Sequence, residues 1–322
     1  MRIIFAGTPD VAVPSLHQLV AEHEVIGVLT RPPAPVGRKR VLTASAVQQA
    51  AQELSLPVLT PRTLKDTAVQ QAIAELKPEA IAVVAYGLLV PADALAIPKY
   101  GWVNLHFSAL PKWRGAAPVQ YALAAGETEI GTSVFQITAG LDTGPIFSTQ
   151  FWSVDAAATA DAVLTQLAQS GAAQLSHTLS DIAAGAVPRA QTGAASYAPR
   201  LTKDDAAVDF AWEAPRVRSL INAVTPAPGA WAQLRGQRIK LGPVQLTDQE
   251  PIPAGEITPD GLVGTGTSPV RLGQVCPAGK PWMDAQSWLR GLSGELKFDP
   301  SPSRNSRLGI PWREVHTDVS AN

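Results

Sequence analysis

The stretch MRIIFAGTPDVAVPSLHQLVAEHEVIGVLT, residues 1–30, reads as a strand, a turn, a helix and a second strand. The run from Arg2 to Ala6 is mostly apolar and stops at Gly7, and Pro9 then suits the first turn of a helix. Apolar residues follow at helical spacing, and a second apolar run covers Val25 to Thr30. This order is typical of an α/β fold that begins with a sheet strand.

The same alternation continues along the chain. A helix is predicted over residues 44–54, and short apolar strands are predicted over 57–60 and 80–85. The pattern predicts a Rossmann-like, doubly wound, mostly parallel sheet with helices on both faces, whose ligands lie beyond the carboxyl ends of the strands. Because the opening turn offers only Gly7 where the dinucleotide fingerprint needs three glycines, NAD binding is not expected.

The rest of the chain predicts a second domain of a different kind. Two strands at 132–138 and 145–154 and a long helix over 159–184 complete a first domain of residues 1–185. Residues 186–203 mix Gly, Pro, Ser and Thr and are interpreted as a linker. Residues 204–322 carry short β-like runs at 230–234, 239–246 and 270–275, separated by Gly and Pro. They predict a smaller β-barrel domain.

Composition excludes several classes of protein. The 322 residues carry a net charge of −1, with 13 Lys and Arg in residues 1–202 and 13 in 203–322, against 14 and 13 acidic residues. Neither half is a basic nucleic-acid-binding block, so any RNA partner must meet local patches. The single cysteine, Cys276, excludes a disulfide framework and a cysteine zinc site. No secretory signal or membrane span is evident, so a cytoplasmic protein is expected.

Polar residues end one of the apolar strands. In WVNLHFSALPKWRGAAPVQ, residues 102–120, Asn104 and His106 stand two apart and therefore on one face of a strand, before a loop that Pro111 begins. Asp142 follows 36 residues after His106 in a Gly-bounded turn. Each residue alone has a simpler interpretation, since a single His is more often a core residue and Asn or Asp can cap a turn. Together, an amide, an imidazole and a carboxylate can stabilise an oxyanion and move protons at an acyl carbon.

At these residues the sequence resembles the folate-dependent formyltransferases, most closely the members that formylate methionyl-tRNA. The matching pieces are FAGTPD from Phe5, VVAYGLLVP from Val83, NLHFSALPKWRGAAPVQ from Asn104 and GLDTG from Gly140. The resemblance implies that Asn104, His106 and Asp142 are the catalytic set. It also implies an OB-like barrel for the second domain, which would bind tRNA.

The resemblance further implies where the folate lies. The family's folate-contacting turn, usually SLLP, corresponds to Ser108, Ala109, Leu110 and Pro111, so that Ala109 replaces a leucine. The turn after the strand at residue 83 presents backbone groups to the pterin ring, which makes Ala85, Tyr86, Gly87 and Leu88 cofactor neighbours. Backbone N–H and C=O groups can match a heterocycle without a distinctive side chain.

A basic cluster, Arg38, Lys39 and Arg40, lies in the proline-rich stretch between Thr30 and Thr43. From composition alone, it is equally well a solvated surface loop. The resemblance implies an RNA-contacting insertion that reaches the acceptor stem.

The expected function is transfer of the formyl group of 10-formyltetrahydrofolate to the α-amino group of initiator methionyl-tRNA, by a monomer that needs no metal. Asn104 and a protonated His106 would hold the oxyanion, and Asp142 would orient the imidazole. The alternatives are the same chemistry on a nucleotide-linked amino sugar and a non-catalytic folate- or nucleotide-binding protein.

Overall fold

The computed structural model describes residues 1–37 and 39–301. Its chain forms two compact units. The first unit comprises Met1–Arg114, Gly131–Trp152 and Leu164–Ala195, and the second comprises Gly115–Ile130, Ser153–Val163 and the chain from Ser196 onward. The domain limits expected from the sequence, with a linker at 186–203, stay a prediction.

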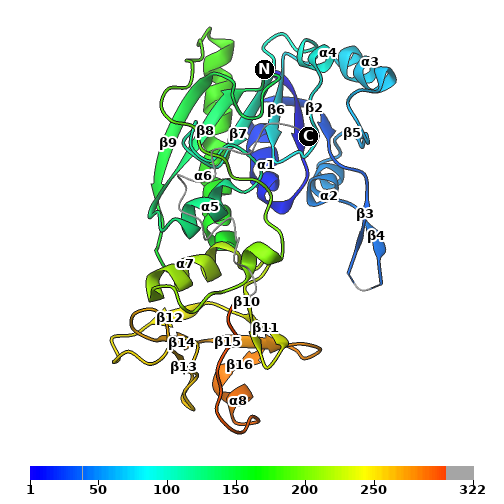
Figure 1. Ribbon diagram of the computed structural model, residues 1–322. Coiled ribbons are helices and arrows are strands. Elements are labelled where there is room, and N and C mark those ends of the chain that lie inside the picture. The colour runs from blue at the N-terminus through cyan, green and yellow to red at the C-terminus, as the bar shows by residue number, and fades with distance from the viewer. Residues whose placement is uncertain (38, 302–322) are drawn as a thin grey trace. The chain divides into compact units, whose positions relative to one another are not determined.

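The first unit is built on a sheet with strand order β5-β2-β1-β6-β7-β8-β9 (Figure 1). The strands are β1 (Arg2–Gly7), β2 (Glu24–Leu29), β5 (Val58–Leu59), β6 (Ala80–Val84), β7 (Trp102–His106), β8 (Glu129–Gln136) and β9 (Ile146–Ser153). The first five of these pair in parallel, whereas β8 runs antiparallel to β7. The predicted mostly parallel, Rossmann-like sheet is therefore confirmed.

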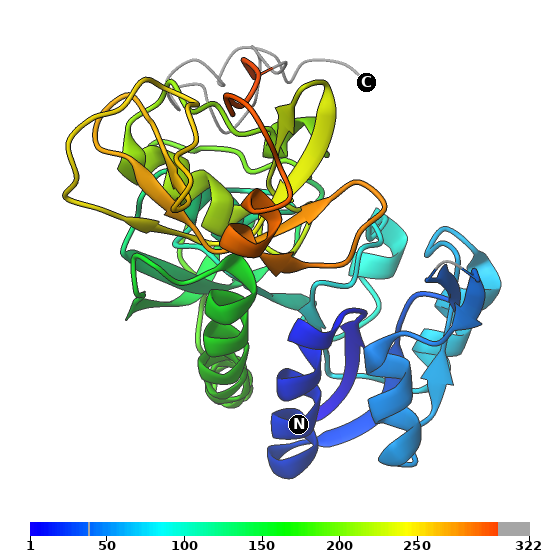
Figure 2. The ribbon, with the colours of Figure 1, turned by 90° about the horizontal axis from the view of Figure 1, so that it is seen from below.

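Helices cover both faces of this sheet. α1 (Val13–Glu22), which follows the short 3-10 turn η1 (Asp10–Ala12), and α2 (Ala46–Glu53) lie side by side (Figures 1 and 2). The strand order reverses direction after β5, so right-handed crossovers put α3 (Thr67–Glu75) on the opposite face. There Ile73 of α3 packs in one buried cluster with Ile81 and Trp102. The short α4 (Ala92–Leu95) and the long α6 (Ala160–Ala183) complete the helices.

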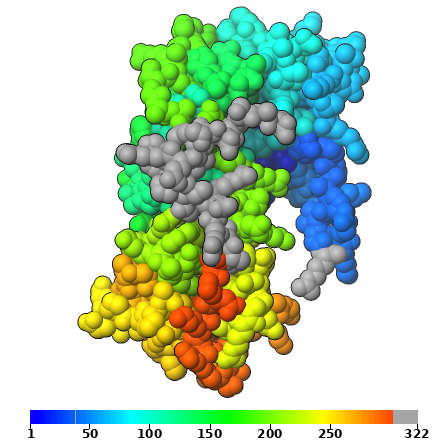
Figure 3. Space-filling view, viewed as in Figure 1, coloured from blue at the N-terminus to red at the C-terminus, as the bar shows by residue number. Residues whose placement is uncertain are grey.

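The basic stretch between β2 and α2 is a hairpin and not an irregular loop. β3 (Ala34–Val36) and β4 (Val41–Thr43) pair antiparallel, with Pro35 opposite Leu42. The proline is tolerated because a two-stranded ribbon has a free edge, where no ladder hydrogen bond is lost. The hairpin projects from the body of the first unit (Figures 1 and 3).

The second unit contains two small antiparallel sheets, which confirms the predicted smaller β domain. One sheet has the order β10-β11-β15-β16 and the other β12-β14-β13. Their strands are β10 (Trp231–Leu234), β11 (Gln237–Leu241), β12 (Val244–Leu246), β13 (Leu262–Val263), β14 (Val270–Leu272), β15 (Gln274–Pro277) and β16 (Met283–Asp284). The runs predicted as single strands at 239–246 and 270–275 each break at a glycine, Gly242 and Gly273. A Cβ at Gly273 would lie only 2.7 Å from the Pro243 carbonyl oxygen, so the two breaks pack together.

The helices of the second unit are α5 (Pro118–Ala124), α7 (Ala214–Ala223) and α8 (Ala285–Leu289), with a 3-10 turn η2 (Asp204–Ala206). No element was predicted from the sequence for the segment that forms α7. Pro215 suits its first turn, and the buried side chains of Val217, Leu220 and Ile221 recur at helical spacing. Among the residues that the structure describes, no helix combines the length and apolar character needed to cross a bilayer.

Candidate active site

The carboxyl ends of β6 and β7 bring the predicted polar residues to one edge of the sheet. Asn104 pairs with Val83 of β6 on one side and with Phe135 of β8 on the other, so β7 is flanked on both sides. Asn104 and His106 share a face of β7, as their spacing predicted. The Asn104 side chain is half-buried, and its amide has no hydrogen-bond partner within residues 1–37 and 39–301. A polar group in this state is suited to bind a ligand.

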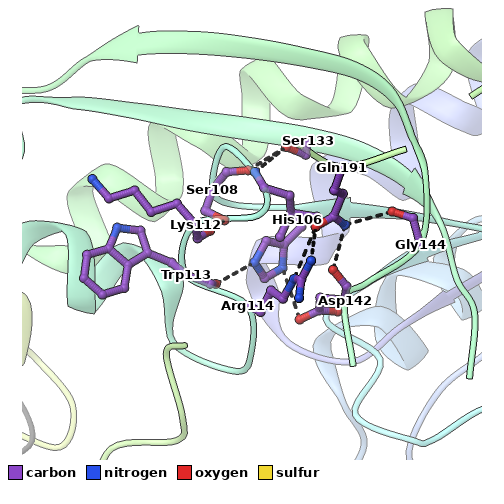
Figure 4. A network of polar contacts seen from close by, with 10 residues as sticks. His106, Ser108, Lys112, Trp113, Arg114, Ser133, Asp142, Gly144 and Gln191 are labelled. Atoms are coloured by element: carbon purple, nitrogen blue, oxygen red, sulfur yellow. Dashed lines mark hydrogen bonds and ion pairs between the residues drawn. The ribbon is translucent and has the colours of Figure 1, made fainter. Parts of the chain in front are cut away.

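His106 is buried, with Trp113 on one side of its ring and Asp142 on the other (Figure 4). Its Nε2 lies 2.9 Å from the Trp113 carbonyl oxygen and therefore donates to it. Its Nδ1 lies 3.9 Å from Oδ2 of Asp142, which is longer than a hydrogen bond. The Phe135 ring meets the imidazole edge-on, with centroids 6.3 Å apart and planes at 88°.

Burial decides the charge of His106 in the ligand-free protein. Removal from water lowers the pKa of His106, and this outweighs the opposite effects of the Asp142 carboxylate and the Trp113 carbonyl. The lowered pKa favours the neutral imidazole near pH 7 in the ligand-free protein. The protonated form expected from the sequence to hold the oxyanion during the reaction stays a prediction. With the Nε2 proton bound to Trp113, the neutral ring turns its lone pair at Nδ1 toward Asp142. A proton taken up at Nδ1 would face the carboxylate.

Asp142 lies in the connection between β8 and β9. Its φ of 50° is in the left-handed region, which Asp and Asn adopt more readily than most residues. Gly144 is required nearby, because a Cβ there would overlap the carbonyl oxygen of Gln136. The Gln191 amide nitrogen donates to the carbonyl oxygens of both Asp142 and Gly144, at 2.8 Å each (Figure 4).

The turn predicted to contact folate, Ser108 to Pro111, is fastened to β8. Ser133 donates its hydroxyl to the Ser108 carbonyl oxygen at 2.8 Å and accepts from the Leu110 N–H at 3.0 Å. The Ser108 hydroxyl donates to the Lys112 carbonyl oxygen, and the Ser108 and Leu110 side chains are buried. Ala109 and Pro111 remain half-buried, so these two residues offer the side-chain surface of the turn.

The segment from Ala85 to Leu88 follows directly after β6. Ala85 and Gly87 are exposed and have φ values of 48° and 81°. Thr8, beyond the end of β1, donates its hydroxyl to the Tyr86 carbonyl oxygen at 2.8 Å. The Tyr86 ring points into the core, where burial raises the pKa of its hydroxyl, and Leu88 packs against the same cluster. Ala85 and Gly87 are thus the exposed residues of this segment, and neither carries a side chain larger than a methyl group.

The basic residues lie apart from this arrangement. Lys39 and Arg40 are exposed in the hairpin that joins β3 to β4, and Arg38 lies outside the described residues. In the part of the chain that is described, neither Lys39 nor Arg40 contacts a catalytic candidate or an acidic partner. No cluster of three His, Cys, Asp or Glu side chains that could hold a metal occurs among the described residues either.

Two polar residues of this site were not predicted from the sequence. Arg114 donates to the Gln191 side-chain oxygen from Nε at 3.2 Å and from an Nη at 2.6 Å (Figure 4). Arg114 stands inside the quoted stretch 102–120, where a charged residue next to Trp113 could have drawn attention. Gln191 stands in the stretch interpreted as a linker, and no local pattern marks it.

Known proteins with similar sequences match about nine tenths of the chain. A family model described as "Formyl transferase" matches residues 1–179, and one described as "Formyl transferase, C-terminal domain" matches residues 200–293. A methionyl-tRNA formyltransferase of Thermobifida fusca is 52% identical over 298 residues, which span 90% of this chain and 96% of the relative. A methionyl-tRNA formyltransferase of Renibacterium salmoninarum is 51% identical over 298 residues, 91% and 97% of the two chains.

A solved structure shares the fold at lower identity. It is the N-formyltransferase from Helicobacter canadensis in complex with folinic acid and dTDP-3-aminofucose, with a TM-score of 0.66 and 19% identity over 85% of this chain and 99% of that one. The resemblance drawn from the sequence motifs is thus confirmed by matches over nine tenths of the chain. The chain belongs to the formyl transferase family, among the methionyl-tRNA formyltransferases.

Proposed function

We propose that this protein transfers the formyl group of 10-formyltetrahydrofolate to the α-amino group of methionyl-tRNA. The observation that carries the proposal is the meeting of Asn104, His106 and Asp142 at one sheet edge in a chain about half identical to proteins named methionyl-tRNA formyltransferase. The proposed acceptor is methionine esterified to initiator tRNA, so the reaction would serve translation initiation. We propose that it takes place in the cytoplasm. We propose that the protein acts as a monomer.

The formyl donor is a substrate that the outward-facing backbone can hold. The main chain of Ala85 and Gly87 is exposed beyond β6, and a Cβ at Gly87 would meet nothing within 4 Å. Open space next to unscreened N–H and C=O groups suits a flat heterocycle with several donors and acceptors. We assign the pterin ring to residues 85–88 and the adjoining part of the donor to the turn of residues 108–111.

The chemistry follows from the unpaired amide and the imidazole–carboxylate pair. The amine of methionine attacks the formyl carbon, and the Asn104 amide donates to the oxygen that becomes negative. Neutral His106 takes up the proton that the attacking nitrogen must lose, and Asp142 stabilises the imidazolium that forms. The same proton returns to N10 as tetrahydrofolate leaves, so no net proton remains on the enzyme.

The tRNA is assigned to local positive patches, because the chain as a whole is slightly acidic. Lys39 and Arg40 are exposed on a projecting hairpin, and Arg38 completes the basic cluster in sequence. Phosphate contacts from such a cluster supply affinity that depends on salt but not on base sequence. The second, C-terminal β unit is proposed to bind the remainder of the acceptor arm.

The test compares acceptors with one donor. Purified protein is incubated with 10-formyltetrahydrofolate and either methionyl-tRNA or a nucleotide-linked amino sugar, and formylated product is measured. Product from methionyl-tRNA alone is expected, whereas product from the sugar alone or from neither acceptor contradicts the proposal. The His106→Ala variant should lose about 10²- to 10⁴-fold in turnover. More than a tenth of the wild-type rate would contradict the role of His106.

A further inference from the structure

We infer that Gln191 is a positioning residue that fixes the Asp142 carboxylate opposite His106, and this inference rests on the proposed function. Asp142 and His106 do not hold each other directly, since the shortest ion-pair distance between them is 3.9 Å. The position of the carboxylate opposite His106 therefore depends on the backbone of its loop as well. The Gln191 side chain binds this backbone by two hydrogen bonds of 2.8 Å, to the carbonyl oxygens of Asp142 and Gly144.

The orientation of the Gln191 amide is fully determined by its partners. Its nitrogen donates to two carbonyl oxygens, of Asp142 and Gly144, which can only accept. Its oxygen accepts from two nitrogens of Arg114, which can only donate. A flipped amide would place donor against donor and acceptor against acceptor, so a single orientation is allowed. Such an amide acts as a rigid link between the two segments it joins.

The two segments joined by Gln191 are those that supply both partners of the His106 ring. Asp142 faces Nδ1, and the Trp113 carbonyl, which accepts from Nε2, directly precedes Arg114. Gln191 thus connects the Asp142 loop, on one side of the imidazole, to Arg114, which adjoins Trp113 on the other side (Figure 4). Because a shift of about 1 Å in a catalytic group can cost roughly 10²-fold in rate, this link bears on turnover and not only on stability.

Two substitutions separate the two halves of the link. Gln191→Glu keeps an acceptor for Arg114 but has no N–H for the Asp142 and Gly144 carbonyls, and Gln191→Met removes both interactions at similar length. Gln174→Met is the matched control, because Gln174 also joins segments of the first unit. It accepts from Thr132 at 2.6 Å and donates to Ser148 at 3.1 Å, and these contacts do not involve the Asp142 loop.

The experiment measures kcat, and KM for both substrates, in the full-length protein at fixed salt, with thermal unfolding as the check on folding. Both Gln191 variants are expected to lose about 10- to 100-fold in kcat with KM changed by less than about threefold. In an Asp142→Asn background the same Gln191 changes should cost less than about twofold, because the carboxylate they position is gone. Gln174→Met should keep kcat near wild type whatever its effect on unfolding.

Three outcomes would overturn the inference. These are a Gln191→Glu variant within threefold of wild-type kcat, an undiminished effect of Gln191→Met in the Asp142→Asn background, and an equal kcat loss in Gln174→Met. If Gln191→Met does not fold, kcat of Gln191→Glu decides, measured in the wild-type and in the Asp142→Asn background. A wild-type protein inactive on methionyl-tRNA contradicts the proposed function instead, whereas an active protein that is indifferent to Gln191 contradicts this inference alone.

Discussion

Replacing Asp142 by Asn isolates the charge opposite His106. Asn has the same size and tolerates the left-handed φ of 50°, so the turn is preserved. At 3.9 Å and an effective dielectric constant of about 20, the attraction between an imidazolium and this carboxylate is at most about 4 kcal/mol. Since about 1.4 kcal/mol corresponds to tenfold in rate, the loss in kcat is limited to roughly 10³-fold. We expect a loss of about 10²- to 10³-fold.

The pH profile gives this variant a second, independent result. The Asp142 carboxylate raises the pKa of His106 against the larger lowering by burial, so its removal lowers that pKa further. Because the proposed role requires neutral His106, the acid limb of kcat/KM should move to lower pH. The matched control is Asp155→Asn, in which a carboxylate that accepts from the Ala157 N–H caps an exposed turn.

The refuting result is specific. If Asp142→Asn keeps more than a tenth of wild-type kcat with an unchanged pH profile, the carboxylate only closes its turn, as an Asn would also do. An acid limb that moves to higher pH would contradict the assignment of that limb to His106.

Three further predictions concern stability and RNA. Burial lowers the pKa of His106, so its neutral ring contributes fully to the free energy of unfolding above about pH 6.5, and this contribution is lost as the pH falls toward the folded-state pKa. In urea unfolding, the His106→Gln variant should show a smaller decline of stability over the same pH range. Gly131→Ala should cost about 1–3 kcal/mol in urea unfolding, because its Cβ would lie 2.5 Å from that of Ala109; a cost near zero would contradict this packing. Joint replacement of Lys39 and Arg40 by Ala should raise KM for methionyl-tRNA, leave KM for the folate donor unchanged, and flatten the salt dependence by up to about two units of slope; equal changes in both KM values would make the hairpin a plain solvated surface.

The apolar runs of the first half of the chain were sufficient to predict its sheet. Strands predicted at Arg2 to Ala6, Val25 to Thr30 and residues 80–85 correspond to β1, β2 and β6. They are buried on both faces, and such strands are continuous in apolar residues and easily recognised. The pairing of Asn104 and His106 on one face followed from strand periodicity alone.

Periodicity failed where helix and turn signals were mixed. The segment of α7 has only short apolar spacing and lies in a stretch rich in Pro and Gly, and no element was predicted for it. The hairpin of β3 and β4 was missed because a proline inside a strand argues against strand structure, except in a ribbon with free edges. In both segments, contacts with the rest of the fold determine the secondary structure more than the local sequence pattern does.

The contacts of the site depend on tertiary structure that no local pattern carries. Gln191 stands 49 residues after Asp142 and 77 after Arg114, in a stretch without periodicity. The lowered pKa of His106 likewise results from its burial, and the sequence of an apolar strand does not show how deeply a single His is buried. Sequence reasoning therefore reached the identities of the reacting groups but not the interactions that set their charge and position.

The backbone at the site is itself unusual. Seven residues other than Gly have positive φ among those described, and three of them, Ala85, Trp113 and Asp142, lie in the three loops that border the site. For a residue as bulky as Trp113, at φ 61°, this conformation is costly, of order 1–3 kcal/mol. In this conformation Trp113 presents its carbonyl to Nε2 of His106, and Asp142 turns its carboxylate toward Nδ1. Since Trp113 accepts from the imidazole and Asp142 faces it, the positive-φ backbone of these two residues helps to fix the orientation and tautomer of the one group in the cluster whose charge can change near neutral pH.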